Sequence, residues 1–404
     1  MTNVCLYFQV HQPFRLRQYP LFDIGKRTGY FDLQKNEEVM KKVAGKCYLP
    51  ANKVILDLIH KHDDFKAAYS ITGTALEQFA EYSPRVLESF EALAATGAVE
   101  FLSETYHHSL SFLFDKDEFS HQVGLHRKAV KEHFGQRPTV FRNTELIYSN
   151  DVAKRAEEMG YKAVLAEGWD GILSWRSPNY VYSAAGTRKM RLLLKNYRLS
   201  DDVAFRFSDK NWNGHPLTAE KYADWLAPIM GDSVNLFMDY ETFGEHQWED
   251  TGIFNFLRSL PRALSAHGIS FTTPNELAKV TPKEAIDVPH YVSWADTERD
   301  TTAWLGNGLQ QSASKKLYQL KEGVLATKDL ALIDAWRKLT TSDHFYYMCT
   351  KWFSDGDVHK YFNPHDSPYE AYIAFMNIMQ DMEIAIKHKN KGVFTKLARL
   401  IAEV

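Results

Sequence analysis

The segment VCLYFQV, residues 4–10, begins a pattern that recurs through the first 280 residues of the chain. It is a short run with apolar residues on both faces, and His11, Gln12 and Pro13 follow it directly. Such runs are typical of strands in a parallel sheet that is covered on both sides. Similar runs lie at residues 65–71, 99–102, 139–141, 162–166, 191–194, 234–238 and 269–271.

Helical patterns separate several of these runs, at residues 86–96, 118–134, 151–160 and 254–267. Asn150 is placed as an N-cap and Gly160 as a C-terminal stop of the third pattern, and Pro261 interrupts the fourth. Strands that alternate with helices predict an α/β fold with a parallel sheet. Seven or eight strands within about 280 residues favour a closed or nearly closed barrel over a small open sheet. Residues 281–288 resemble a linker, and the pattern from Leu309 onward is helical.

The composition argues against several classes of partner. The chain has 48 Lys and Arg against 51 Asp and Glu, a net charge of −3, which gives no long-range attraction to DNA, RNA or an anionic membrane. No apolar stretch reaches the ~18–20 residues that a membrane span needs, and the N-terminus lacks the pattern of a signal peptide. The three cysteines, Cys5, Cys47 and Cys349, are widely spaced and are interpreted as reduced, so we expect a cytoplasmic protein.

Polar side chains follow most of the predicted strands. In parallel barrels the carboxyl ends of the strands form one mouth, where active sites lie, so these side chains are expected to converge there. They are His11, Glu77, Glu104, His107, His108, Arg142, Glu145, Glu167, Asp170, Asp239 and Glu241.

Several carboxylates at one mouth indicate glycoside hydrolysis, which needs one carboxyl to protonate the leaving oxygen and another to attack or to activate water. Aromatic residues, 14% of the chain, suit sugar rings as well as a core. A metal-dependent hydrolase is the alternative, with His11, Glu104, His107 and His108 as ligands, but no HExxH-like spacing supports it. A single acid after a strand is more often a salt-bridge partner or cap, whereas six polar strand ends together favour a site. No phosphate-loop, GxGxxG or GxSxG motif is present, and we predict neither cofactor nor metal.

Five segments resemble glycoside hydrolase family 57, and within it the α-amylase-like group. The segments with FRNTEL and MDYETFG are the most specific, and all five occur in the family's order, at residues 11–13, 73–77, 141–146, 237–244 and 298–307. The resemblance implies an incomplete (β/α)7 TIM-like barrel followed by a C-terminal α-helical region. One of the apolar runs would then not be a barrel strand. The expected domains are a catalytic barrel at 1–285 and a helical region at 286–404 that completes the substrate cleft.

The resemblance also implies a retaining mechanism on α-glucans, with Glu145 as the nucleophile and Asp239 as the acid/base. Substrate-contacting positions of the family fall on His11, Glu77, Glu241, Asp300 and Trp304. An ordinary core position is the alternative for Trp304.

Two further side chains are expected to contribute to this site. Arg142 is a candidate to hold the charge of Glu145, and His107 is a candidate to bind hydroxyls, although a packed loop histidine is an equal alternative for His107. Asp239 must begin the reaction protonated, and a neighbouring carboxylate such as Glu241 favours that state.

The predicted function is therefore a retaining α-amylase-type glycoside hydrolase that cleaves α-1,4-glucans such as starch, glycogen and maltodextrins through a covalent intermediate. A 4-α-glucanotransferase would use the same site, since the sequence does not decide whether water or a sugar hydroxyl receives the glycosyl group. A catalytically silent carbohydrate-binding relative is the alternative outside the enzymes.

Overall fold

The computed structural model describes residues 2–26, 28–351 and 363–402. The chain forms two compact units. Unit 1 comprises Met1–Gln12, Glu37–Tyr106 and Phe119–Thr301, and unit 2 comprises Pro13–Asn36, His107–Glu118 and Thr302–Val404.

Unit 1 contains two sheets that are mostly parallel. The first has the order β3-β2-β1-β8, and all its pairs are parallel: β1 (Asn3–Val10), β2 (Ala67–Ile71), β3 (Val99–Phe101) and β8 (Ser233–Asp239). The second has the order β4-β5-β7-β6-β9, with β4 (Val140–Arg142), β5 (Ala163–Glu167), β7 (Arg191–Lys195), β6 (Tyr182–Ala184) and β9 (Ala285–Ile286). In this second sheet, β6 runs antiparallel to β7, and the remaining pairs are parallel. The predicted α/β class with parallel sheets is confirmed.

One isolated bridge and one backbone hydrogen bond also connect strands of the two sheets. Ser103, just after β3, forms a parallel bridge with Phe141 of β4. After β7, the backbone N–H of Asn196 donates to the carbonyl of Asn235 in β8 at 2.9 Å. One buried cluster draws side chains from strands of both sheets: Cys5, Tyr7, Ala68, Val140, Leu165, Leu193 and Phe237. Because Cys5 and Tyr7 point into this cluster, the alternation of β1 brings Gln9 to the same face at the carboxyl end of the strand.

The predicted strand at residues 269–271 is wrong. Phe271 makes only an isolated bridge to Val4, and the chain then enters α12 (Pro274–Leu277). Thr273 caps that helix with a capping box, and Pro274 lacks the N–H that a ladder would need, so the segment ends after one bridge. The short strands β6 and β9, of three and two residues, were not predicted.

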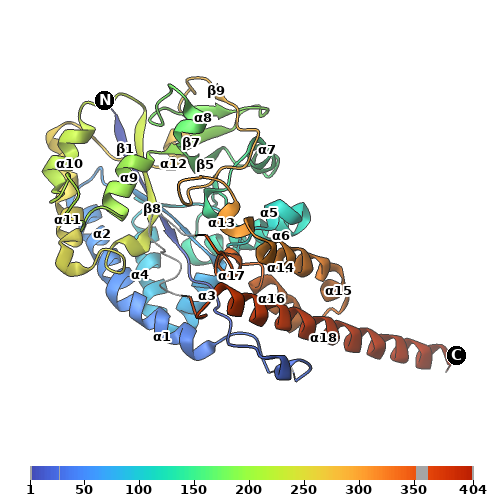
Figure 1. Cartoon of the computed structure of the whole chain (residues 1–404). Coiled ribbons are helices and arrows are strands. Elements are labelled where there is room, and N and C mark those ends of the chain that lie inside the picture. Colours follow the sequence, from blue (N-terminus) through green and yellow to red (C-terminus); the bar gives the residue numbers. More distant parts are fainter. Residues whose placement is uncertain (1, 27, 352–362, 403–404) are drawn as a thin grey trace. The chain divides into compact units, whose positions relative to one another are not determined.

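Helices surround the strands of unit 1. Figure 1 shows β1 and β8 side by side in this unit, and α9 packs against β8. The helices are α2 (Leu49–Lys61), α3 (Gly73–Tyr82), α4 (Pro84–Ala95), α7 (Asn150–Glu158), α8 (Asp170–Leu173), α9 (Tyr197–Ala204), α10 (Ala219–Leu226), α11 (Ile253–Ala266) and α12; α1 (Leu33–Val43) and α6 (Lys116–Phe134) continue into it from unit 2.

One predicted helix end and one predicted helix interruption differ from the structure. The N-cap of α7 is Ser149 rather than Asn150, which is the first helical residue, and Gly160 adopts φ 89° just beyond the helix. Helix α11 continues through Pro261, with the flanking Leu257 and Leu264 buried, because tertiary packing of its apolar face outweighs the lost hydrogen bond.

Unit 2 is helical. Its helices are α5 (Ser111–Phe114), α13 (Thr302–Leu305), α14 (Gly308–Gln319), α15 (Lys321–Ala326), α16 (Leu330–Lys338), α17 (Ser342–Tyr346) and α18 (Pro368–Ala402). An ion pair of 2.6 Å between Lys316 and Glu383 joins α14 to α18, and the buried indole of Trp336 donates to the carbonyl of Leu317 at 2.9 Å. In the described part of the chain, no helix combines the length and the apolar character needed to cross a membrane.

Candidate active site

Glu145 follows β4 in a short 3-10 turn, Thr144–Leu146. Its backbone lies in the left-handed region, with φ 57° and ψ 25°, and its side chain is almost fully buried. The amide of Asn143 donates to the carbonyl of Ile147 at 2.9 Å and so closes the turn around Glu145. This conformation costs free energy in a residue other than glycine, and such backbone strain is concentrated at functional sites.

A segment about 150 positions further along the chain pairs with this turn. Tyr148 and Val292 exchange two backbone hydrogen bonds, of 2.8 and 2.9 Å. Two residues on, the indole Nε1–H of Trp294 donates to Oε2 of Glu145 at 2.8 Å, and the backbone N–H of Trp294 donates to the carbonyl of Glu145 at 3.3 Å. The carboxylate of Glu145 is therefore held by a side chain that the sequence did not single out.

Arg142, the last residue of β4, is fully buried beside this pair. Its guanidinium carbon lies 4.9 Å from the centre of the Trp294 ring, and Nη1 lies 3.9 Å from Oε2 of Glu104. Glu104 also accepts from Nε2 of Gln9 at 3.1 Å. The ion-pair partner of Arg142 is thus Glu104, which compensates its charge in the interior.

The second predicted catalytic carboxyl, Asp239, is the last residue of β8 and lies opposite Gln9 in the parallel register. The chain then turns into η4 (Tyr240–Thr242), which contains the buried Glu241. Oε1 of Glu241 accepts from the hydroxyl of Tyr48 and from Nε2 of Gln12, the latter at 3.4 Å. Burial raises the pKa of Glu241 to about 8, and the negative charge of Asp239 adds to the increase.

Tyr7 on β1 is influenced by charged residues near both predicted catalytic carboxyls, Glu145 after β4 and Asp239 on β8. Burial raises the pKa of Tyr7, and the charged groups that act on its hydroxyl include Arg142, Glu104 and Asp239. Charged residues at the end of β4 and at the end of β8 therefore both influence the pKa of Tyr7, a core residue of β1.

A cluster of four buried charges adjoins Trp294. Lys195 lies 3.0 Å from Asp201 and 3.7 Å from Glu167, and Arg299 lies 3.2 Å from Glu167 and 3.6 Å from Asp201. Burial raises the pKa of Glu167, while Lys195 and Arg299 oppose the increase. Arg299 also donates to the backbone carbonyl of Trp294 at 2.5 Å, so the cluster anchors the segment that carries the indole.

The remaining predicted residues of unit 1 occupy loop and helix positions around these strands. His11 follows β1, and its Nδ1 lies 3.0 Å from the hydroxyl of Thr72. Glu77 on α3 accepts from the hydroxyl of Tyr106 at 3.0 Å. Asp300 is partly buried, and its backbone carbonyl accepts from the hydroxyl of Ser293 at 2.6 Å.

Two predicted residues belong to unit 2. His107 is buried, and its carbonyl accepts from the hydroxyl of Thr341 at 2.8 Å. Trp304 on α13 is fully buried, with its ring centre 6.4 Å from that of Tyr346. Their roles as substrate contacts stay predictions.

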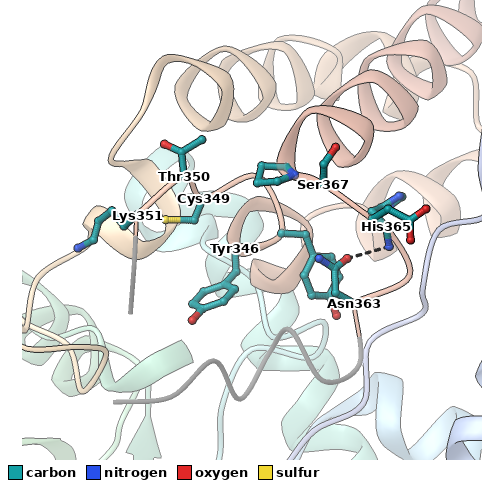
Figure 2. A pocket seen from close by; sticks show the side chains of 10 residues that line it. Tyr346, Cys349, Thr350, Lys351, Asn363, His365 and Ser367 are labelled. Atoms are coloured by element: carbon teal, nitrogen blue, oxygen red, sulfur yellow. Dashed lines mark hydrogen bonds between the residues drawn. The ribbon is translucent and has the colours of Figure 1, made fainter. Parts of the chain in front are cut away.

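Unit 2 also contains a pocket of about 220 Å³ (Figure 2). Burial lowers the pKa of His365 in its wall to about 4, and the backbone N–H of that residue donates to the side chain of Asn363 at 3.0 Å. None of the predicted site residues is among the described residues that line it, which are Tyr346, Tyr347, Cys349, Thr350, Lys351, Asn363, His365, Asp366, Ser367 and Pro368. Within the described residues, no group of three or more His, Cys, Asp or Glu side chains is arranged to hold a metal ion.

Sequence reasoning missed Trp294, Tyr48 and Lys195. Tyr48 lies within a helical turn, and Lys195 is the last residue of β7, with uncharged residues directly before and after it in the sequence. Lys195 was recoverable in principle, because it occupies the same strand-end position that singled out the acids.

Comparisons with known proteins identify the family of the chain. The model of glycosyl hydrolase family 57 matches residues 5–289. A protein of Methanocaldococcus jannaschii named "Putative alpha-amylase" is 46% identical over 398 residues, and the match covers 94% of this chain and 84% of that protein.

Solved structures share the fold at low identity. The 4-alpha-glucanotransferase from Thermococcus litoralis has a TM-score of 0.69 at 14% identity; the match covers 94% of this chain, which spans 59% of the length of that enzyme. The alpha-amylase AmyC from Thermotoga maritima has a TM-score of 0.60 at 11% identity and covers 96% and 94% of the two chains. The family match extends over most of the chain, and the chain therefore belongs to glycosyl hydrolase family 57 and is a glycoside hydrolase.

Proposed function

We propose that the protein is a retaining hydrolase of α-1,4-glucans, with Glu145 as the nucleophile and Asp239 as the acid/base. The observation that carries the proposal is the state of Glu145, a buried carboxylate on a left-handed residue at the carboxyl end of a parallel strand. The names of the similar proteins, an alpha-amylase and a 4-alpha-glucanotransferase, support an α-glucan as the substrate.

The fold that we propose for this site is the incomplete (β/α)7 barrel that the family resemblance implies. It would use β1, β2, β3, β4, β5, β7 and β8, all parallel. The bridge from Ser103 to Phe141 and the hydrogen bond from Asn196 to Asn235 support closure of these strands around one core. In such a barrel the carboxyl ends of β4 and β8 open onto one mouth.

The reaction needs one carboxyl that is ionised and one that is protonated. Glu145 attacks the anomeric carbon and forms an ester, while Asp239 gives its proton to the departing glycosidic oxygen. Asp239 then takes a proton from water, whose oxygen attacks the anomeric carbon and releases Glu145. Retention by this route requires the two carboxyls to lie ~5–5.5 Å apart.

Glu241 supports the acid role of Asp239. Burial and the negative charge of Asp239 raise the pKa of Glu241 to about 8, so Glu241 keeps its proton at neutral pH, and we propose that Asp239 shares this proton when it acts as the acid. A pair of interacting carboxyls that holds one proton can supply it to a leaving group. We assign substrate contacts to His11, Glu77, His107, Arg142, Glu241, Asp300 and Trp304, and the contribution of residues 286–404 to the cleft stays a prediction.

Incubation with maltoheptaose tests the proposal, with products separated over time and the anomer of the fresh product followed by NMR. We expect shorter sugars only, released as the α-anomer, and loss of turnover in Glu145→Gln and Asp239→Asn. Longer and shorter sugars together would indicate a 4-α-glucanotransferase with the same intermediate. Unchanged maltoheptaose, or activity that survives Glu145→Gln, would contradict the proposed function.

A further inference from the structure

We infer that Trp294 is a positioning residue for the nucleophile, and that Arg142 and Lys195 on its indole strengthen the hydrogen bond with which it holds Glu145. This inference rests on the proposed role of Glu145 and adds a residue to that role.

The contact is directional. Trp294 is bonded to Glu145 twice, through the indole N–H to Oε2 and through the backbone N–H to the carbonyl. An indole has a single donor, so its bond fixes the position of one carboxylate oxygen, Oε2. The strained turn aims the side chain of Glu145, and the indole fixes the orientation of its carboxyl group.

Two cations contact the same ring. The guanidinium carbon of Arg142 lies 4.9 Å from the ring centre and Nζ of Lys195 lies 5.4 Å from it, both within the ~6 Å range of cation–π interactions. Positive charge at the ring draws electron density away from Nε1, and the N–H becomes a stronger donor to an anion. Each cation is itself held by buried acids: Arg142 by Glu104, and Lys195 by Asp201 and Glu167.

This arrangement affects the two chemical steps differently. The hydrogen bond stabilises Glu145 most when the residue is a carboxylate and less when it is an ester, because an ester oxygen is a weaker acceptor. The donor therefore favours the ionised enzyme and assists the departure of Glu145 from the glycosyl-enzyme. Its loss should slow breakdown of the intermediate more than its formation.

Trp294→Phe keeps the ring and removes the donor, and Trp175→Phe, at an indole that is 78% exposed, is the matched control. A hydrogen bond to a charged group contributes about a factor of 10 to 100. With maltoheptaose we expect kcat of Trp294→Phe to fall by about that factor, kcat/KM near neutral pH to fall less, and the acidic limb of the kcat/KM profile to move up by about one pH unit. Trp175→Phe should match the wild type in all three measurements.

A second measurement follows the wild-type chain, and it uses the Glu145→Gln variant only to assign one resonance. In ¹⁵N-indole spectra, the resonance that changes in Glu145→Gln is assigned to Trp294. This resonance should shift when a 5-fluoro-α-maltosyl fluoride esterifies Glu145. The resonance of the exposed Trp175 should not shift. If the wild type forms no adduct at Glu145, the proposed function itself fails. If the adduct forms but no indole resonance responds, or Trp294→Phe keeps the wild-type acidic limb and ratio of kcat to kcat/KM, only the inference about Trp294 fails.

Discussion

Glu241→Gln is expected to stabilise the protein at alkaline pH and to change its stability little at acidic pH. The carboxyl is buried, and burial together with the charge of Asp239 raises its pKa from an ordinary 4.5 to about 8. Because the folded state binds this proton more tightly than the unfolded chain, the stability that the neutral carboxyl provides is complete below pH 4.5. It is lost as the pH rises to about 8. A glutamine stays neutral throughout and can still accept from Tyr48 and Gln12 through its carbonyl oxygen.

The size of the effect follows from the pKa. At about 1.4 kcal/mol per pH unit, the full cost of ionisation is about 5 kcal/mol, of which about 4 kcal/mol falls between pH 5 and pH 9. For a domain of more than about 200 residues, 1 kcal/mol corresponds to about 2 °C in Tm, so the advantage of the variant should grow by about 8 °C over that range.

Calorimetric melting of the wild type and the variant from pH 5 to pH 9 measures this difference directly, and other titrating groups largely cancel in the subtraction. Glu220→Gln, at the exposed start of α10, is the control and should differ from the wild type by the same small amount at every pH. A difference for Glu241→Gln that stays constant across the range would refute the reasoning.

Two further substitutions test the structure around the site. Glu167→Gln leaves Lys195 and Arg299 with less compensation in the interior and should cost about 3–5 kcal/mol in urea unfolding, whereas a loss below about 1 kcal/mol would show that the cluster is not a coupled network. Gly244→Ala should lower the free energy of unfolding by more than about 2 kcal/mol, because Gly244 has φ 111° and a Cβ there would overlap a backbone carbonyl. The control is Gly252→Ala, at φ 85° with open space around it, which should lower the free energy of unfolding by only about 1 kcal/mol. Equal losses in the two variants would contradict this account.

The parts of the fold that could be predicted have strong local signals. Strands β1 and β8 are long and apolar on both faces, and this pattern indicates a buried parallel strand without any knowledge of the neighbours. Asp239 stands out because it ends β8, and Glu145 and Glu241 stand out because they lie just beyond β4 and β8. For these residues, position along the chain is enough to propose a shared site.

Other features depend on contacts between distant segments. Trp294 reaches Glu145 across 149 positions, and it lies in an irregular segment whose course is set by the pairing of Val292 with Tyr148. The extended conformation of β8 ends at Asp239, so strand alternation does not describe Glu241, whose environment comes from Tyr48 and Gln12. Segments 13–36 and 107–118 join unit 2 through tertiary contacts that no local pattern encodes.

The central claim, that Glu145 and Asp239 act as nucleophile and acid/base on one sugar, is tested most directly by trapping the intermediate in Asp239→Ala. An α-maltosyl fluoride carries a leaving group that needs no proton, so the variant can form the glycosyl-enzyme but lacks the base that hydrolyses it. Mass spectrometry should find one maltosyl group on the peptide that contains Glu145, and azide should release it as α-maltosyl azide. An unlabelled enzyme that still turns over the fluoride, or a label on another residue, would contradict the account.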